Sequence, residues 1–302
     1  MNDKIAGKFR GTGVKAGLMY GMAEFYGGGA FVIINTFFLV FLTKALGMPA
    51  ALAGAIPMVG KVWDAITDPM MGNITDRTSS RFGPKRLYIL IGGILSAIAF
   101  ISLWTTIPSR STTVQFIYYI VMYCLFSTCF TIIMVPYNGL LPDMVDSYDI
   151  RSKFSSLRMI WSTVGAILAG LVPTLMIKDT LNTSMYLKVA IIFGILFGFA
   201  AVVTFIGTWE KVKPPVKTKL RDSFSEASSV LRSRSFKIFI GIYLSGQCAM
   251  DFVSGMAIYY VDDVLGGYDK GYLTMLMGVL LSSQLVGMII FTPIMTRTSK
   301  RT

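Results

Sequence analysis

The sequence predicts an all-α protein that crosses a membrane several times, and three observations support this prediction. Hydrophobic residues make up 54% of the 302 residues and charged residues only 15%, whereas soluble domains carry roughly 25% charged residues. The mean hydropathy is +0.63. Apolar runs of about 20 residues recur along the chain, and this is the length that a helix needs to cross the hydrocarbon core of a bilayer.

Eight such runs predict eight transmembrane helices. In chain order they cover approximately residues 17–42, 50–71, 87–107, 115–137, 156–177, 186–209, 238–264 and 272–295.

The loops between these runs differ in their content of basic residues. Of the 28 Lys and Arg residues, 22 lie in alternate segments that include the N-terminal arm, and five lie in the segments between them. Because basic loops stay in the cytoplasm, we expect a multi-pass protein of the cell membrane with a cytoplasmic N-terminus. The net charge of +12 then faces anionic lipid, and nucleic-acid binding is not expected.

The longest predicted loop divides the chain unevenly, with six runs before it and two after it. It contains Pro214, Pro215, several serines and eight basic residues, a composition typical of a linker. We therefore expect an N-terminal six-helix bundle over residues 1–209, a basic cytoplasmic linker over 210–237, and a partial second bundle of two helices over 238–302.

Two acidic residues of the second run are the strongest indication of function. A charged group at the bilayer centre costs about 3 kcal/mol, so such residues face a bundle interior or a water-filled cavity and serve transport. Asp64 and Asp68 are spaced i, i+4, which places them on one helix face about 6 Å apart. Two carboxylates at this spacing can hold one hard cation, and a proton can use the same pair.

Other helices offer polar groups at a similar depth. Glu24, Asp64 and Thr131 all lie six or seven residues from the predicted cytoplasmic ends of their runs, about 9–11 Å into the membrane at 1.5 Å per residue. We predict a cation site, sodium being one candidate ion, formed by Asp64, Asp68 and the Thr131 hydroxyl. In the alternative interpretation, Lys61 neutralises Asp64 as a structural ion pair.

The composition gives no indication of an enzyme or of a cofactor. Histidine is absent, and the three cysteines fall within apolar runs, so neither a catalytic dyad nor a zinc site is expected. Gly27, Gly28 and Gly29 lack the spacing of a phosphate loop and are more typical of close helix packing.

The loop after the second run carries an ordered set of glycines and charged residues: Gly72, Asp76, Arg77, Gly83 and Arg86. This order resembles the signature that major facilitator transporters carry between helices two and three. Asp76 can cap a helix end and pair with an arginine, and Gly83 allows a tight turn. The alternative is an ordinary basic cytoplasmic loop.

A more specific resemblance begins at Trp63. Residues 63–72, WDAITDPMMG, resemble the W-D-A-x-x-D-P-x-x-G stretch of the glycoside–pentoside–hexuronide:cation symporters, the family of the melibiose carrier. Residues 20–25 and 135–143 agree with the family as well, and Arg158 matches an arginine that begins its helix five. The similarity runs from about Lys15 to the end of the chain.

This resemblance implies a major facilitator fold of two six-helix halves. About eight of the twelve helices are present, and we expect helices nine to twelve to be missing from a C-terminally incomplete chain. The implied activity is symport of a sugar or glycoside with Na⁺ or H⁺ by alternating access. The alternative is a non-transporting regulator or a degenerate remnant of the same fold.

The resemblance also implies roles for individual residues. Asp64 and Asp68 would coordinate the coupling ion with help from Thr131, and Glu24, Tyr26 and Arg158 would line the path of the substrate or proton. Gly28 and Met134 stand where the melibiose carrier has sugar-binding aspartates, which argues against a galactoside. Tyr26, Trp63 and Tyr137 could stack on a sugar ring, with packing as the alternative. The expected partners are the sugar and the bilayer, and the oligomeric state stays open.

Overall fold

The computed structural model describes residues 13–109, 111–210 and 233–266, together with short stretches between 271 and 286. Helices account for all regular structure in this part of the chain, which confirms the predicted all-α class. In order, the elements are α2 (Val14–Gly21), α3 (Ala23–Ile33), η1 (Ile34–Phe38), η2 (Phe41–Ala45), α4 (Ala50–Arg77), α5 (Pro84–Ser102), α6 (Thr112–Met144), α7 (Tyr148–Met176), α8 (Thr183–Gly207), α10 (Arg234–Tyr259) and η3 (Tyr260–Val264).

The first seven predicted spans coincide with these helices, although several helices run further than predicted. The second span ends at Arg77 instead of residue 71, and the fourth ends at Met144 instead of residue 137. Residues 211–232 of the predicted linker and most of the eighth span lie outside the described residues. Six of the described helical segments are long and apolar enough to cross a membrane, and α4 is not among them. Lys61, Asp64 and Asp68 lower its apolar character.

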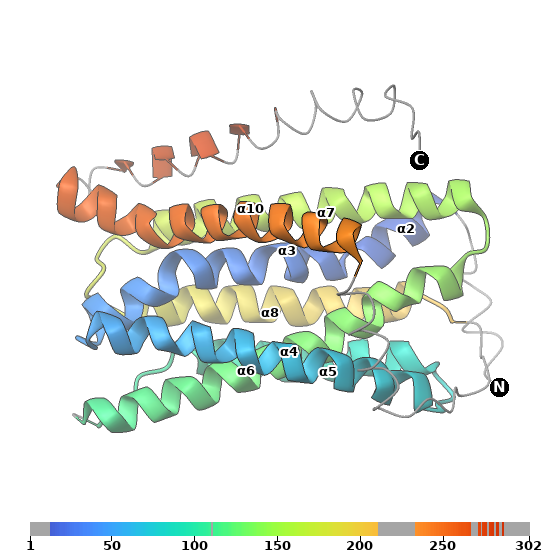
Figure 1. The fold of residues 1–302 in the computed structure, drawn as a ribbon, viewed down its shortest axis with the longest axis horizontal. Helices are drawn as coiled ribbons and strands as arrows, with labels where there is room; N and C mark the ends of the chain where they lie inside the picture. Colours follow the sequence, from blue (N-terminus) through green and yellow to red (C-terminus); the bar gives the residue numbers. More distant parts are fainter. Residues whose placement is uncertain are drawn as a thin grey trace.

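The helices lie side by side in one bundle (Figure 1). α5 packs between α6 and α8, α4 packs on α6, and α3 packs along α7. The first span changes character along its length: α2 and α3 meet at Met22, and the π-helical turns η1 and η2 follow. This span therefore reaches α7 and α8 with its first part and α10 with η1.

Glycines allow α3 and α7 to approach each other closely. A Cβ added to Gly28 would lie 2.5 Å from the Ser162 carbonyl oxygen, and one added to Gly165 would lie 2.4 Å from the Phe25 carbonyl oxygen. Both distances are shorter than any real Cβ contact, so only glycine fits there. The prediction that the glycine run serves helix packing is confirmed. The same contact explains why Gly28 cannot be replaced by an aspartate.

Large aromatic side chains fill one end of the bundle. Phe38 and Phe41 from the first span contact Trp104, and the Trp104 ring stacks on Tyr186 of α8 at a centroid distance of 5.9 Å. All four side chains are almost completely buried. Rings of this size bury about 150–250 Å² each, so this cluster fixes how the first span sits against α5 and α8.

Candidate functional site

The two carboxylates of α4 each face a hydroxyl group of α6. Ser127 Oγ donates a hydrogen bond to Asp64 Oδ1, and Thr131 Oγ1 donates one to Asp68 Oδ1 at 2.7 Å. Both pairs have the same residue offset, and each pair lies one helical turn from the other. The structure thus places Asp64, Asp68 and Thr131 together, as the spacing predicted.

Burial differs between the two sides of this arrangement. Ser127 and Thr131 are 1% and 3% exposed, Asp64 is half-buried, and Asp68 is exposed. The hydroxyls are therefore held in the α4–α6 contact, while the carboxylates keep one side open. Trp63 extends the row, because its Nε1 donates to Thr128 Oγ1 at 2.8 Å. Sequence reasoning missed Ser127, although its position one turn before Thr131 could have indicated it.

The alternative interpretation required an ion pair between Lys61 and Asp64, and the structure does not form this pair. Lys61 Nζ lies 3.9 Å from Asp251 Oδ2 on α10, and 5.8 Å from the centre of the Phe31 ring. Asp251 also accepts hydrogen bonds from Asn35 and Gln247. The Asp64 carboxylate accepts a hydrogen bond from the Ser127 hydroxyl instead.

The residues around Asp64 and Asp68 fit a small hard cation by their chemistry. They offer two carboxylates and two hydroxyl oxygens, and hard cations prefer oxygen donors. Within the described part of the chain, no three His, Cys, Asp or Glu side chains gather as a metal site. Hydroxyl oxygens would complete the ligand set here.

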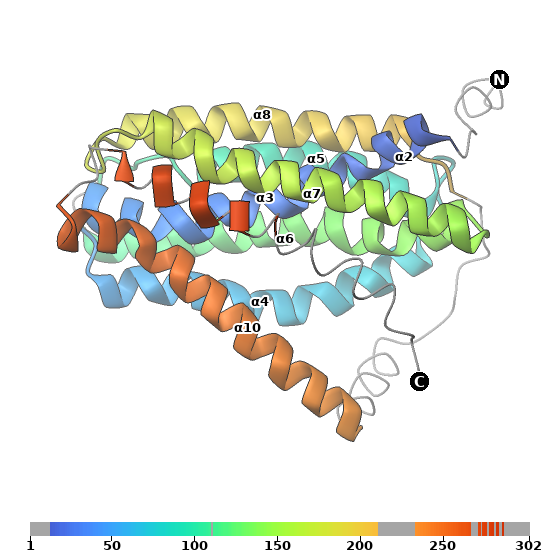
Figure 2. The same ribbon diagram turned by 90° about the horizontal axis from the view of Figure 1, so that it is seen from above.

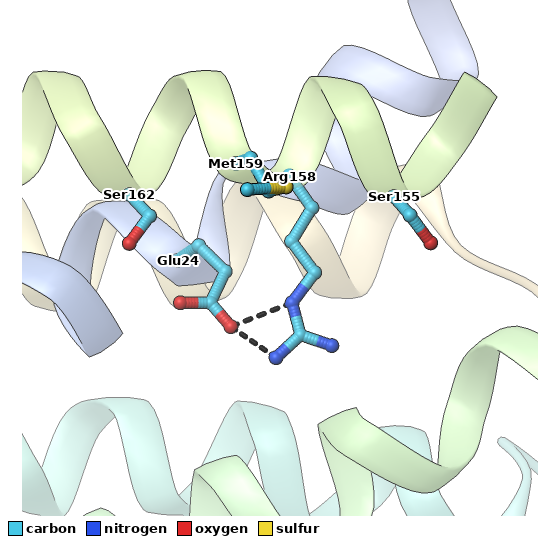
Figure 3. Close-up of a pocket in the computed structure, with 5 residues that line it drawn as sticks. All are labelled: Glu24, Ser155, Arg158, Met159 and Ser162. Carbon is cyan, nitrogen blue, oxygen red and sulfur yellow. Dashed lines mark hydrogen bonds and ion pairs between the residues drawn. The ribbon is translucent and has the colours of Figure 1, made fainter. Parts of the chain in front are cut away.

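Glu24 and Arg158 form a second polar group, on α3 and α7. Arg158 Nε donates to Glu24 Oε1 at 2.6 Å, and another guanidinium nitrogen contacts the same oxygen (Figure 3). Arg158 also donates to Asn138 Oδ1 at 2.5 Å, and its guanidinium lies 4.7 Å above the Tyr137 ring. Several donors and one carboxylate therefore converge where α3, α6 and α7 meet.

This group lines an open pocket of about 330 Å³. Its other lining residues come from α7: Ser155, Met159 and Ser162. Figure 3 shows the Glu24 and Arg158 side chains pointing toward each other at this place. The volume lies at the lower end of the range of about 300–1,000 Å³ for small-molecule sites, and paired donors and acceptors suit a ligand rich in hydroxyl groups.

Tyr26 does not line this pocket. Its side chain is 1% exposed, its hydroxyl is hydrogen-bonded to Ser96, and its ring packs on Phe130 and Phe197. Tyr137 is also fully buried, stacked on Tyr20 at 4.9 Å. The packing alternative therefore describes both tyrosines. Trp63, which is 41% exposed, is the one of the three predicted aromatic residues with an open ring surface.

The residues of the loop motif separate into different roles. Gly72, Asp76 and Arg77 lie in the last turns of α4, and Asp76 is exposed. Gly83 has φ +94° just before α5, which confirms the predicted tight turn. The carboxylate at the start of α5 comes from Glu210, which accepts from the backbone N–H of Lys85 at 3.0 Å. Glu210, and not Asp76, thus binds the start of α5, and capping of a helix end by Asp76 stays a prediction.

Two basic residues fix the beginning of α5 to its neighbours. Lys85 Nζ donates to the Gly139 carbonyl at 2.8 Å and pairs with Asp143 on α6. Arg86 donates to the Phe205 carbonyl at 2.6 Å, and its guanidinium lies 4.7 Å from the Phe205 ring. The motif thus joins α5, α6 and the end of α8.

Comparison with known proteins gives a consistent picture. A family model described as MFS/sugar transport protein matches residues 19–302. An uncharacterized symporter of Synechocystis is 38% identical over 158 residues, which are 50% of this chain and 29% of the relative. The inner membrane symporter YicJ of Escherichia coli is 26% identical over 84% of this chain and 55% of its own length.

A further relative in Escherichia coli, the putative glycoside/cation symporter YagG, is 26% identical over 85% of this chain and 58% of its own length. The matched part of the chain therefore spans between 29% and 58% of the length of these curated relatives.

Proposed function

Because this chain belongs to the MFS/sugar transport protein family, a family of membrane transporters and not of enzymes, we propose that it takes part in symport of a sugar or glycoside with Na⁺ or H⁺. The transport step is alternating access, in which the substrate path opens to one side of the membrane at a time. The name of the similar YagG protein, a putative glycoside/cation symporter, agrees with both parts of this proposal.

The observation that carries the proposal is the pairing of Asp64 with Ser127 and of Asp68 with Thr131. Two acidic side chains on a helix inside a membrane bundle are costly unless they serve a cation or proton path. Their partners are neutral hydroxyls, so the charge of the two carboxylates would be partly neutralised by a Na⁺ ion or a proton. We therefore assign the coupling ion to Asp64 and Asp68, with Thr131 and Ser127 as supporting oxygen ligands.

The pocket at Glu24 and Arg158 is the proposed place of the substrate. The Glu24 carboxylate accepts hydrogen bonds and the Arg158 guanidinium donates them, which matches the vicinal hydroxyls of a sugar. Ser155 and Ser162 add hydroxyl groups along α7. Gly28 and Met134 carry no carboxylate, so Glu24 supplies the acidic group of this pocket.

Uptake measurements on the full-length protein in liposomes test the ion assignment. A panel of glycosides would be offered under an inward Na⁺ gradient and, separately, an inward proton gradient. We expect Asp64→Asn and Asp68→Asn to abolish ion-driven accumulation. Thr131→Val, which keeps the side-chain shape but loses one oxygen, should weaken ion activation about tenfold.

Asp179→Asn is a suitable control, because Asp179 lies outside the bundle helices and accepts a hydrogen bond from the Leu181 backbone that asparagine can also accept. Accumulation against a gradient by both Asp64→Asn and Asp68→Asn would show that the assignment is wrong. A wild-type protein without ion-dependent flux for any glycoside would instead favour the non-transporting alternative.

A further inference from the structure

α10 touches the rest of the protein mainly near its C-terminal end. Side chains from residue 241 to 250 are all exposed, whereas Ala257, Ile258 and Val261 are buried. Figure 2 shows α10 close to the bundle at the end that leads into η3 and diverging from α4 toward its beginning. The contact of α10 with the first span is therefore concentrated on η1, and beyond it the side chains of η3 reach Lys44 of η2.

One lysine of the first span binds two acids at this contact. Lys44 Nζ donates to Asp262 Oδ2 at 2.6 Å and to Asp263 Oδ1 at 2.7 Å. The Lys44 side chain is 19% exposed and that of Asp263 is 58% exposed. The lysine therefore bridges the two carboxylates.

Two further polar contacts join the first span to α10. The hydroxyls of Thr43 and Tyr259 are hydrogen-bonded to each other. Deeper in the bundle, Asn35 Nδ2 donates to Asp251 Oδ1 at 3.0 Å. Ile258, whose side chain is 0% exposed, lies between Asp251 and Tyr259 in the sequence. The contact between the first span and α10 is thus apolar at Ile258 and carries charged groups at both ends, Asp251 at one and Lys44 at the other.

We propose that Lys44, Asp262 and Asp263 form an ionic latch that holds α10 against the first span and closes the substrate path at this end. The proposal rests on the proposed transport function, because alternating access requires one end of the path to be closed while the other is open. The positive-inside pattern predicts that the latch lies on the extracytoplasmic side, since Lys44, at the end of the first span, is one of the five basic residues counted on that side.

The chemistry of the latch suits a contact that must break and reform. A permanently packed seam between membrane helices would gain most from small apolar residues. By contrast, charged groups at the water-facing end can be rehydrated when the helices separate, so the free-energy cost of opening stays moderate. Three charges at one point also give the closed arrangement a defined register, because Lys44 must meet both carboxylates at once.

Thiol accessibility tests the latch without measuring transport. Cys248 is exposed and lies three residues before Asp251 on α10, which places it near the helix face that carries Asp251. A Cys124→Ala/Cys129→Ala background leaves Cys248 as the one thiol among residues 1–302. A membrane-impermeant maleimide would be added to right-side-out and to inside-out vesicles that contain the full-length protein.

We expect Lys44→Ala to raise the labelling rate of Cys248 about tenfold from the latch side, which corresponds to a moderate shift between two populated states. Labelling from the opposite side should fall. The exchange Lys44→Asp with Asp262→Lys keeps one positive and two negative charges and should restore wild-type labelling. Lys178→Ala, an exposed lysine on the same predicted side, is the matched control and should change nothing.

Unchanged labelling of Lys44→Ala in both vesicle orientations would overturn the latch, and so would an exchange variant that labels like Lys44→Ala. If Lys44→Ala does not fold, Asp263→Asn removes the more exposed carboxylate and should give a smaller increase of the same sign. Because the readout is labelling, a protein that shows the latch but no ion-driven uptake would refute the transport proposal alone.

Discussion

Alanine at Gly165 should push α3 and α7 apart and weaken both the bundle and the Glu24–Arg158 pair. The added Cβ would lie 2.4 Å from the Phe25 carbonyl oxygen and 3.0 Å from the Phe25 Cα. Ordinary van der Waals contacts begin at about 3.4 Å, so the overlap is about 1 Å. Both atoms of Phe25 belong to the backbone, and a rotamer change cannot relieve it. The two helices must separate locally.

The magnitude follows from this overlap. Overpacking a tight contact costs about 1–3 kcal/mol, and each kcal/mol lowers the unfolding temperature by roughly 2–4 °C for a domain of 150–250 residues. We therefore expect Gly165→Ala to lower the Tm by about 2–12 °C. Glu24 precedes Phe25 directly, so a separation of about 1 Å would also lengthen the 2.6 Å contact from Arg158 beyond hydrogen-bonding distance.

Thermal unfolding of the detergent-solubilised protein, followed by tryptophan fluorescence, measures the first effect. Glycoside binding to the same preparation measures the second. Gly54→Ala is the matched control, because it changes a glycine of helix α4 that has no atom within 4 Å of an added Cβ. It should be neutral or should raise stability by up to about 1 kcal/mol. Equal Tm values for the two variants would refute the packing argument.

Two further predictions concern the charged groups. Arg158→Lys should lower the apparent substrate affinity about tenfold in uptake assays, because an ammonium cannot contact Glu24, Asn138 and the Tyr137 ring together. A variant with wild-type affinity would contradict this role of the guanidinium group. Burial raises the pKa of Glu210 above its ordinary value of 4.5, more than the backbone N–H groups of Lys85 and Arg86 lower it. The folded state then binds the Glu210 proton more tightly than the unfolded state, so wild-type stability relative to Glu210→Gln should fall as pH rises from 4.5 through the raised pKa and level off above it. Tm values of both proteins between about pH 4 and 8 measure this difference, and a difference that grows in favour of the wild type with rising pH would contradict it.

Several features of the protein could be predicted from the sequence because they depend on neighbours along one helix. Hydropathy over about 20 residues located seven described helices. The i, i+4 spacing placed Asp64 and Asp68 on one face, and three consecutive glycines indicated a close helix contact. In each case the information is local: helix geometry fixes which residues share a face, and the bilayer fixes the length of an apolar run.

The contacts between helices were determined only by the tertiary structure. The alternative interpretation made Asp64 the partner of Lys61, but the structure pairs Lys61 with Asp251, 190 positions later in the chain. Ser127, which completes the row of hydroxyls opposite the carboxylates, and Glu210, which binds the start of α5, were not identified beforehand. The Tyr26 ring was expected near the substrate and lies in the core. These outcomes depend on the rotation and register of each helix against its neighbours. Those quantities are fixed by the sum of many weak packing contacts, such as the glycine contact of α3 with α7, and no single stretch of sequence contains them.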